Sequence, residues 1–231
     1  MPHLTKRQKQ IVKIVDKTKK YALKEAISVL KKAPQPKFDQ TLTISFKLNV
    51  DQKETPQPVR GTVALPHGTG KKVKVAVFCK GEAASDAKTA GADFIGANDL
   101  IEKVTAGWTD FDVAISTPDM MKDLGKLGKV LGPRGLMPNP KAGTVTQDVA
   151  KAIKEVKAGK IEFRMDKQSN IHAAIGKISF AENAIFNNAN SLIETVLRSK
   201  PQTIKGNFVK SITIASTMGP GCRLALDQFK V

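Results

Sequence analysis

The chain has 231 residues, of which 41% are hydrophobic, and it lacks the apolar run of about 18 residues that a membrane-spanning helix needs. A chain of this size can bury one large core or two small ones. Its first residues lack the apolar segment and cleavage site of a secretory signal, so a cytoplasmic protein without membrane contact is expected. The 38 Lys and Arg residues exceed the 21 Asp and Glu residues, a net charge of +17 that favours a polyanionic partner such as a nucleic acid.

The positive charge is concentrated at the two ends of the chain. Residues 68–159 hold 14 basic and 11 acidic side chains, whereas the remaining residues hold 24 and 10. The ends therefore carry the field that would attract a polyanion. The two cysteines, Cys79 and Cys222, are far apart and in no metal-binding spacing, so we expect two reduced thiols packed as small hydrophobic groups.

The N-terminal region predicts two basic helices and two strands. Apolar residues recur with helical spacing within residues 11–15 and 23–30, and Pro34 stops the second helix. Residues 41–48 alternate strictly, with Leu42, Ile44, Phe46 and Leu48 on one face, which is typical of a strand with one buried and one solvated face. A loop at 51–58 and a second strand at 59–65 follow. We interpret the Pro- and Gly-containing residues 66–70 as a hinge.

The middle region predicts a parallel α/β unit. Residues 73–79 form a nearly continuous apolar run, as expected of a strand buried on both faces. Asp148 is expected to cap a final helix that Gly159 ends. Between these elements, strands and helices alternate, with strands at 94–95 and 113–116 and helices at 83–90 and 100–105.

After Gly159 the alternating pattern returns, as in the N-terminal region. Residues 161–165 and 171–178 predict an antiparallel hairpin, and residues 181–197 and 211–216 predict a helix and a last strand. The simplest architecture is two domains. Residues 1–67 and 160–231 would form a discontinuous basic α+β domain, and residues 68–159 would form an inserted, nearly neutral α/β domain.

No enzymatic fingerprint accompanies the predicted α/β domain. Its first strand is followed by a single glycine, Gly81, where a dinucleotide-binding turn needs three, and Gly68–Lys72 departs from the phosphate-binding loop. The histidines His3, His67 and His172 share no ligand spacing. We therefore expect no enzyme, no cofactor and no metal. The alternative is an RNA-modifying enzyme whose inserted domain holds a cofactor, which binding of S-adenosylmethionine or a dinucleotide would support.

The segment from Gly125 to Thr146 holds five glycines and three prolines, a composition that suits a fixed surface loop with several turns. Two interpretations stay open. The segment could be an elaborate connection, or it could be a basic loop that contacts RNA or a neighbouring protein through Lys126, Lys129, Arg134 and Lys141.

Five segments carry a family resemblance that covers essentially the whole chain: VRGTVALPHGTGK (59–71), GWTDFDVAISTPDMM (107–121), LGPRGLMPNPKAGTV (131–145), KAGKIEFRMDK (157–167) and STMGPG (216–221). Together they resemble the bacterial form of ribosomal protein L-one, the stalk protein of the large ribosomal subunit. The resemblance implies a discontinuous first domain and an inserted Rossmann-like second domain. It also implies a monomer off the ribosome that binds large-subunit ribosomal RNA at the mobile stalk, assists release of deacylated tRNA from the exit site, and represses translation of its own messenger RNA.

The resemblance places the main RNA contacts on the terminal domain, at Lys37, Phe38, Thr41, Arg164, Lys167, His172, Ser211, Thr217, Met218 and Gly219. Hydroxyls, a few cations and exposed apolar groups suit an RNA that is recognised by shape, 2′-hydroxyls and phosphates. Gly219 is expected to let the backbone donors of the 217–219 turn approach a sugar. Lysines between Lys6 and Lys24 would add non-specific attraction to phosphate.

Each of these residues also has a structural interpretation. Phe38 could belong to the core, Met218 could fill a gap, and His172 could be a hydrogen-bonded strand residue. Lys37, Arg164 and Lys167 could be ordinary surface cations, and the hydroxyls could merely suit β structure.

Overall fold

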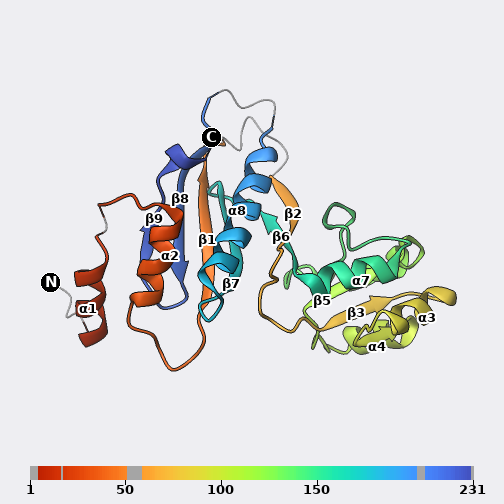
Figure 1. Ribbon diagram of the computed structural model, residues 1–231. Coiled ribbons are helices and arrows are strands. Elements are labelled where there is room, and N and C mark those ends of the chain that lie inside the picture. Colours follow the sequence, from red (N-terminus) through yellow and green to blue (C-terminus); the bar gives the residue numbers. More distant parts are fainter. Residues whose placement is uncertain (1–4, 17, 51–58, 202–205, 230–231) are drawn as a thin grey trace. The chain divides into compact units, whose positions relative to one another are not determined.

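The computed structural model describes residues 5–16, 18–50, 59–201 and 206–229, and these divide into two compact units (Figure 1). Unit 1 contains the described residues up to Gly70 and those from Ile161 onward, and unit 2 contains Lys71–Lys160. The chain passes from one unit to the other at these two points. The loop predicted at 51–58 lies outside the described residues.

Unit 1 is built on a four-stranded antiparallel sheet in the order β7-β1-β8-β9. In the central strand, the alternation expected from the sequence is confirmed, because Leu42, Ile44, Phe46 and Leu48 are all buried. The last strand is short and was not predicted. The four strands are β1 (Thr41–Leu48), β7 (Asn170–Lys177), β8 (Val209–Ser216) and β9 (Gly221–Arg223).

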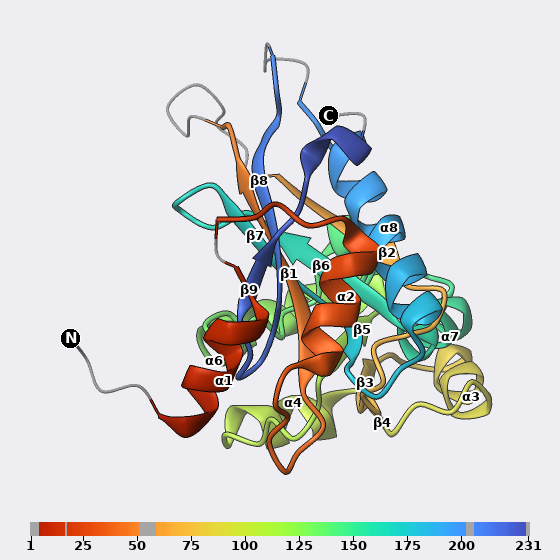
Figure 2. The ribbon, with the colours of Figure 1, turned by 60° about the vertical axis from the view of Figure 1, so that its left-hand side comes forward.

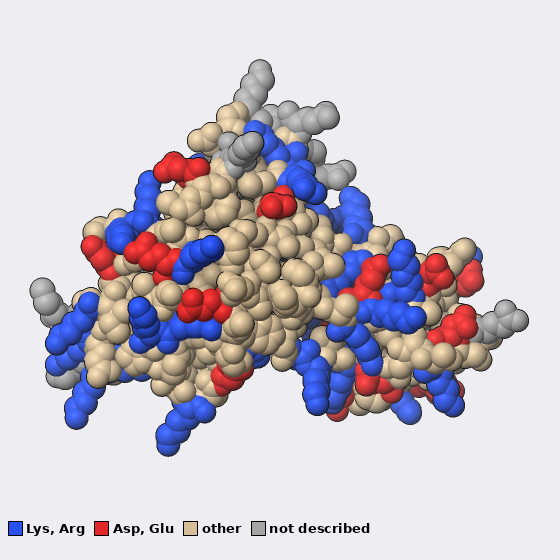
Figure 3. All heavy atoms as spheres, in the orientation of Figure 1, with Lys and Arg blue, Asp and Glu red and all other residues tan. Residues whose placement is uncertain are grey.

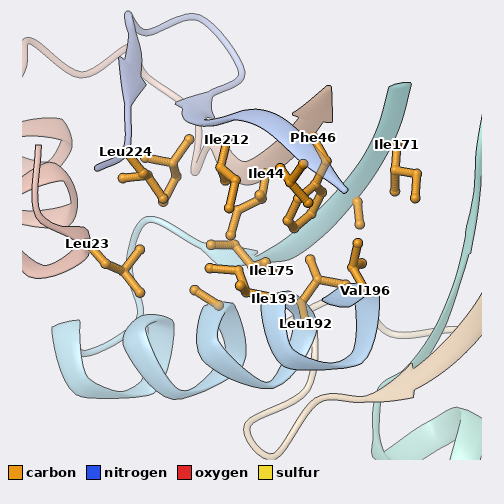
Figure 4. Close-up of a cluster of buried hydrophobic side chains, with 14 of the residues drawn as sticks. Leu23, Ile44, Phe46, Ile171, Ile175, Leu192, Ile193, Val196, Ile212 and Leu224 are labelled. Atoms are coloured by element: carbon orange, nitrogen blue, oxygen red, sulfur yellow. The ribbon is translucent and has the colours of Figure 1, made fainter. Parts of the chain in front are cut away.

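Helices α2 (Leu23–Lys32) and α8 (Glu182–Arg198) cover one face of this sheet (Figure 1). Side chains of α8 pack against sheet residues such as Ile44, Ile175 and Ile212, and none of these is accessible to solvent (Figure 4). Burial of this apolar surface is the main force that holds the helices on the sheet. The opposite face is free of α2 and α8. A further helix, α1 (Lys6–Ile14), lies beside β9 (Figure 2).

The predicted hairpin between 161–165 and 171–178 is wrong in its pairing. Strand β6 (Lys160–Arg164) joins β2 (Arg60–Ala64) in a separate two-stranded sheet, and β7 pairs with β1. Within the described chain, β6 and β7 meet only at an isolated bridge between Met165 and Ile171. Closeness in sequence favours a hairpin, but each strand pairs instead with a strand from the N-terminal region, β6 with β2 and β7 with β1.

Unit 2 is a three-layered α/β unit around the parallel sheet β4-β3-β5. Alternate residues of β3 face opposite layers: Ala76 and Phe78 join one apolar cluster, and Val75 and Val77 join the other. The predicted parallel unit is confirmed. Its elements are β3 (Val75–Phe78), β4 (Phe94–Gly96), β5 (Val113–Ser116), α3 (Glu82–Thr89), α4 (Asn98–Thr105) and α7 (Val149–Ala158).

The glycine- and proline-rich segment is more regular than predicted. It contains short helical turns whose leucines, Leu127 and Leu131, are buried against β3 and α4, so it is part of the core and not a plain surface loop. The leucines are spaced by about one helical turn and form a buried apolar face. The high glycine and proline content of the segment had not indicated this face. The turns are η1 (Pro118–Met120), α5 (Met121–Leu124), η2 (Gly125–Leu127), α6 (Gly128–Leu131) and η3 (Pro140–Ala142).

For α7, the final helix of unit 2, the predicted cap at its start is wrong and the predicted end is confirmed. Asp148 occupies its N-cap position, but its side chain makes no capping hydrogen bond, since its ψ of 73° turns the residue away from the usual cap geometry. The helix ends as predicted. Gly159 adopts the left-handed conformation, with φ of 109°, that glycine accommodates without steric cost.

The residues interpreted as a hinge, 66–70, are anchored to unit 1. The buried side chain of Asn188 accepts a hydrogen bond from the backbone N–H of His67 (3.0 Å) and donates to the carbonyls of Gly68 (2.9 Å) and Ile175 (2.8 Å). A buried amide with its polar atoms satisfied holds its partners firmly. The passage into unit 2 therefore begins after Gly70.

Candidate nucleic-acid interface

The face of the unit 1 sheet opposite α2 and α8 carries a row of polar side chains. In the register of the sheet, Ser45 lies opposite His172 on one side and Thr213 on the other, and Thr213 lies opposite Arg223. Because paired residues point to the same face, these four side chains form one row across all four strands. The row carries an imidazole on β7, hydroxyls on β1 and β8, and a guanidinium on β9. The Ser45 Oγ and the His172 Nδ1 are 2.9 Å apart. We define His172, Ser45, Thr213 and Arg223 as the sheet row.

A neighbouring position on the same face holds Ser211, which lies opposite Lys47. Ser211 is half-buried and Lys47 is exposed. The predicted contact residue Ser211 therefore shares the face of the sheet row. Ser45, Thr213 and Arg223 were not among the predicted contact residues.

At one end of the sheet, Thr41 and Thr217 are joined by three hydrogen bonds. The Thr217 N–H donates to the Thr41 carbonyl (3.1 Å), and the Thr41 N–H donates to the Thr217 Oγ1 (3.1 Å). The Thr217 hydroxyl in turn donates to the Thr41 carbonyl (3.2 Å). The Lys177 Nζ donates to the Thr41 Oγ1 (2.8 Å), which adds a cation that the sequence did not single out.

The turn that follows β8 does not offer the free backbone donors that we expected. The Thr217 N–H is used by Thr41, the Met218 N–H donates to the Oε1 of buried Gln40 (2.9 Å), and the Gly219 N–H donates to the Ser216 carbonyl (3.0 Å). The small size of Gly219 lets the Ser216 side chain approach the turn closely. A Cβ there would lie 2.0 Å from the Ser216 Oγ, well inside the contact distance.

Phe38 and Met218 are not core residues. Their exposed fractions are 52% and 59%, which rules out the interpretation of Phe38 as core and of Met218 as a gap filler. Phe38 lies two residues before Gln40, the residue whose side chain accepts the Met218 N–H. The segment before β1 and the turn after β8 are thus joined, and each presents a large apolar group to solvent. Lys37 is exposed in the same segment.

Two predicted cations lie outside the strands of the four-stranded sheet. Arg164 is exposed on β6, in the two-stranded sheet, and Lys167 is exposed in the turn between β6 and β7. Asp166 organises that turn by accepting the backbone N–H groups of Asn170 (2.7 Å) and Gln168 (2.8 Å). The hydrogen bond from the Asn170 backbone lowers the pKa of Asp166 below its usual range.

Basic side chains dominate the surface of α1. Lys6, Lys9 and Lys13 are exposed, and Figure 3 shows Lys and Arg side chains gathered over this helix at the left of the view. Lys126, Arg134 and Lys141, the predicted secondary contacts, are exposed in unit 2, and Arg134 donates a hydrogen bond to the Thr109 hydroxyl. They are not part of the unit 1 face.

The described residues contain no helix that is long and apolar enough to cross a membrane. Among the same residues, no three His, Cys, Asp or Glu side chains lie close enough together to hold a metal ion. Cys79 and Cys222 are buried free thiols, as expected, and burial raises the pKa of Cys222 to about 11.

Comparison with known proteins decides the family. Residues 29–220 match the model of the ribosomal protein L1p/L10e family. This chain belongs to that family. Relatives in the L1p/L10e family include the large ribosomal subunit protein uL1 of Protochlamydia amoebophila, 53% identical over 97% of this chain and 95% of the relative. The proteins of the same name from Thermosipho melanesiensis (52% identical, 97% of each chain) and Kosmotoga olearia (51% identical, 100% of this chain and 99% of the relative) are also similar.

Membership of the L1p/L10e family confirms three predictions. The resemblance noted in the sequence is correct, the fold class of combined α/β and α+β units is confirmed, and the chain is a structural ribosomal protein and not an enzyme. The alternative of an RNA-modifying enzyme with a cofactor in the inserted unit is therefore rejected.

The residues that sequence reasoning missed differ in how well they could have been found. Thr213 lies two residues after Ser211 in a predicted strand, so alternation alone places it on the same face. Arg223 lies in a three-residue strand with no pattern of its own, and its position depends on pairing with β8. Gln40 and Lys177 are recognisable only from their contacts with Met218 and Thr41.

Proposed function

We propose that this L1p/L10e family member is a structural component of the large ribosomal subunit and binds the stalk segment of its ribosomal RNA through unit 1. The binding surface comprises the sheet row, the Thr41–Thr217 pair, and the exposed Phe38 and Met218. One observation carries the proposal: hydroxyls, cations and two exposed apolar side chains lie on or next to one sheet face that α2 and α8 leave uncovered.

The chemistry of this surface suits folded RNA. Hydroxyls such as those of Ser45 and Thr213 can exchange hydrogen bonds with 2′-hydroxyls, which are both donors and acceptors. Arg223 and Lys177 can approach phosphates, and Phe38 can pack on an exposed base or sugar. A surface with few cations among many neutral groups favours recognition by shape over simple charge attraction.

Unit 2 would make secondary contacts. Its charge is nearly balanced, and its exposed cations Lys126, Arg134 and Lys141 would touch RNA or a neighbouring ribosomal component outside the main surface. We further propose that the chain assists release of deacylated tRNA from the exit site. Repression of its own messenger RNA would use the unit 1 surface, so an operator fragment of that messenger should compete with stalk RNA.

The proposal is tested by the salt dependence of binding. If neutral groups supply part of the affinity, binding to a stalk fragment of large-subunit RNA should weaken less steeply between about 50 and 200 mM salt than binding to a random duplex. Fluorescence anisotropy with both RNAs measures the two slopes. Equal slopes and equal affinities would contradict the proposal.

A matched pair of variants localises the surface. Met218→Ala should weaken the binding of stalk RNA about tenfold, since it removes an exposed apolar group from the turn at one end of the surface. Ile14→Ala, which also truncates an exposed apolar side chain of unit 1, should bind like the parent. If the two variants lose affinity equally, the surface lies elsewhere.

A further inference from the structure

The position of α1 is not set by the hydrophobic core. None of its residues is buried, and Val12 and Ile14 are 56% and 40% exposed. Its first turn is closed by a capping box between Thr5 and Gln8, which stabilises the helix but does not attach it to the sheet. The attachment must come from other contacts.

The C-terminal end of α1 is attached through the segment that follows it. Val15 is buried, and the hydroxyl of buried Tyr21 accepts the Asp16 N–H (2.9 Å) and donates to the Asp16 carbonyl (3.2 Å). Within the helix, Ile11 and Val12 lie beside β8 and β9, where they line a groove together with Thr213 and Arg223 of the sheet row.

Near the other end of α1, the side chain of Arg7 attaches the helix to the rest of unit 1. Its Nε donates to the Pro34 carbonyl (3.1 Å), and its Nη2 donates to the Met218 carbonyl (3.0 Å). Pro34 belongs to the segment that presents Phe38, and Met218 is itself an exposed apolar group of the proposed surface. Arg7 is half-buried, in contrast to the exposed Lys6, Lys9 and Lys13 of the same helix.

We infer that Arg7 is a positioning residue for RNA recognition: its guanidinium joins α1 to the two segments that present Phe38 and Met218. This inference rests on the proposed function of unit 1. It separates Arg7 from Lys6, Lys9 and Lys13, whose exposed ammonium groups can attract phosphate. Arg7 acts instead through the geometry of its two carbonyl acceptors.

The choice of arginine follows from this geometry. A guanidinium has several nitrogens in a rigid plane and can place one on each of two carbonyls that belong to different segments. A lysine has one nitrogen on a flexible stem, so it keeps the charge but loses the two-point fork. Arg7→Lys and Arg7→Gln should therefore both release the contact, although only the second removes a charge.

The first experiment uses the free full-length protein, which makes it independent of RNA binding. The methyl signal of Met218 and the amide signal of Thr217 should shift in NMR spectra of Arg7→Lys and Arg7→Gln, and should stay unchanged in Lys9→Gln. Thermal unfolding should stay close to that of the parent, because α1 adds no buried residue to the core. Unshifted Met218 and Thr217 signals in both Arg7 variants would overturn the inference.

The second experiment measures the ratio of affinities for the stalk fragment and a random duplex. Both Arg7 variants should lower this ratio about tenfold. Lys9→Gln should leave the ratio unchanged, and the slope of log affinity against log salt concentration should become less steep by about one, as expected for the loss of one phosphate contact. Retained selectivity in Arg7→Lys, with loss only in Arg7→Gln, would make Arg7 an ordinary phosphate cation. Equal affinity of the parent for both RNAs would instead reject the proposed function, whatever the NMR result.

Discussion

At the scale of single residues, hydrogen bonds within the protein restrict what the proposed surface can offer to RNA. A hydroxyl has one hydrogen and two lone pairs. The Thr217 hydroxyl donates to the Thr41 carbonyl and accepts the Thr41 N–H, which leaves one lone pair. RNA can therefore only donate to Thr217. The residue contributes by holding the sheet end together as well as by direct contact.

Replacement of Thr217 tests this double role. Thr217→Val keeps the shape of the side chain but removes the two hydrogen bonds that its hydroxyl makes to Thr41, so the free energy of unfolding should fall by about 1 kcal/mol. Stalk RNA affinity should fall in the same variant, and Thr217→Ser should restore both properties. Urea unfolding and anisotropy measure the two effects. Unchanged stability and affinity in Thr217→Val would remove Thr217 from the site.

At the scale of elements, the turn between β6 and β7 shows how a short segment is fixed without a hairpin. The strands on either side pair with different partners and, among the described residues, meet each other only at the Met165–Ile171 bridge, so a continuous ladder does not define the turn. Asp166 does so instead, by accepting two backbone N–H groups and the Asn170 side chain (3.1 Å). An ionised carboxylate is the stronger acceptor, and the pKa of Asp166 is lowered accordingly.

The pH dependence of this turn follows from the sign of the shift. Because the folded-state pKa of Asp166 is below its unfolded value, the stabilisation is present above the unfolded pKa and is lost as pH falls through the folded pKa. The protection of the Gln168 and Asn170 amides against hydrogen exchange, relative to their intrinsic rates at each pH, should fall over that acidic range. Asp166→Asn should show reduced protection at both amides without this pH dependence. A carboxyl titration of Asp166 at its ordinary pKa would contradict the expectation.

At the scale of the whole molecule, the two units have separate hydrophobic cores. One cluster contains the buried side chains of unit 1, and two others contain those on either side of the unit 2 sheet. No described cluster mixes residues of both units. Since stability comes mainly from such burial, each unit has the means to fold by itself. The proposed RNA surface lies wholly in unit 1.

This separation predicts a division of labour. Joining Gly70 to Lys160 through a short glycine linker retains every described unit 1 element, and the product should fold and still select stalk RNA. Residues 71–159 alone should fold but show no preference among RNAs. Circular dichroism verifies folding, and anisotropy measures selectivity. If both pieces fold and only the unit 2 piece discriminates, the surface belongs near Lys126, Arg134 and Lys141.

The sequence by itself determined the types of most elements and the family, and it led us to expect two units. The alternation in 41–48 indicates a strand that is buried on one face, and the apolar run at 73–79 indicates a strand that is buried on both. These patterns can be recognised without tertiary information because each depends only on which residues of the strand are apolar. It also indicated Thr41, Ser211 and Met218 by resemblance, although their contact with RNA stays a prediction.

Only the tertiary structure decided which groups meet. The partners of β6 and β7, the strand that carries Arg223, and the occupied N–H groups of residues 217–219 depend on segments far apart in the chain. Arg7 is indistinguishable in sequence from the lysines beside it, yet it contacts residues 27 and 211 positions away. Periodicity records the environment of one residue, whereas a hydrogen bond between distant residues depends on the packing of every element between them.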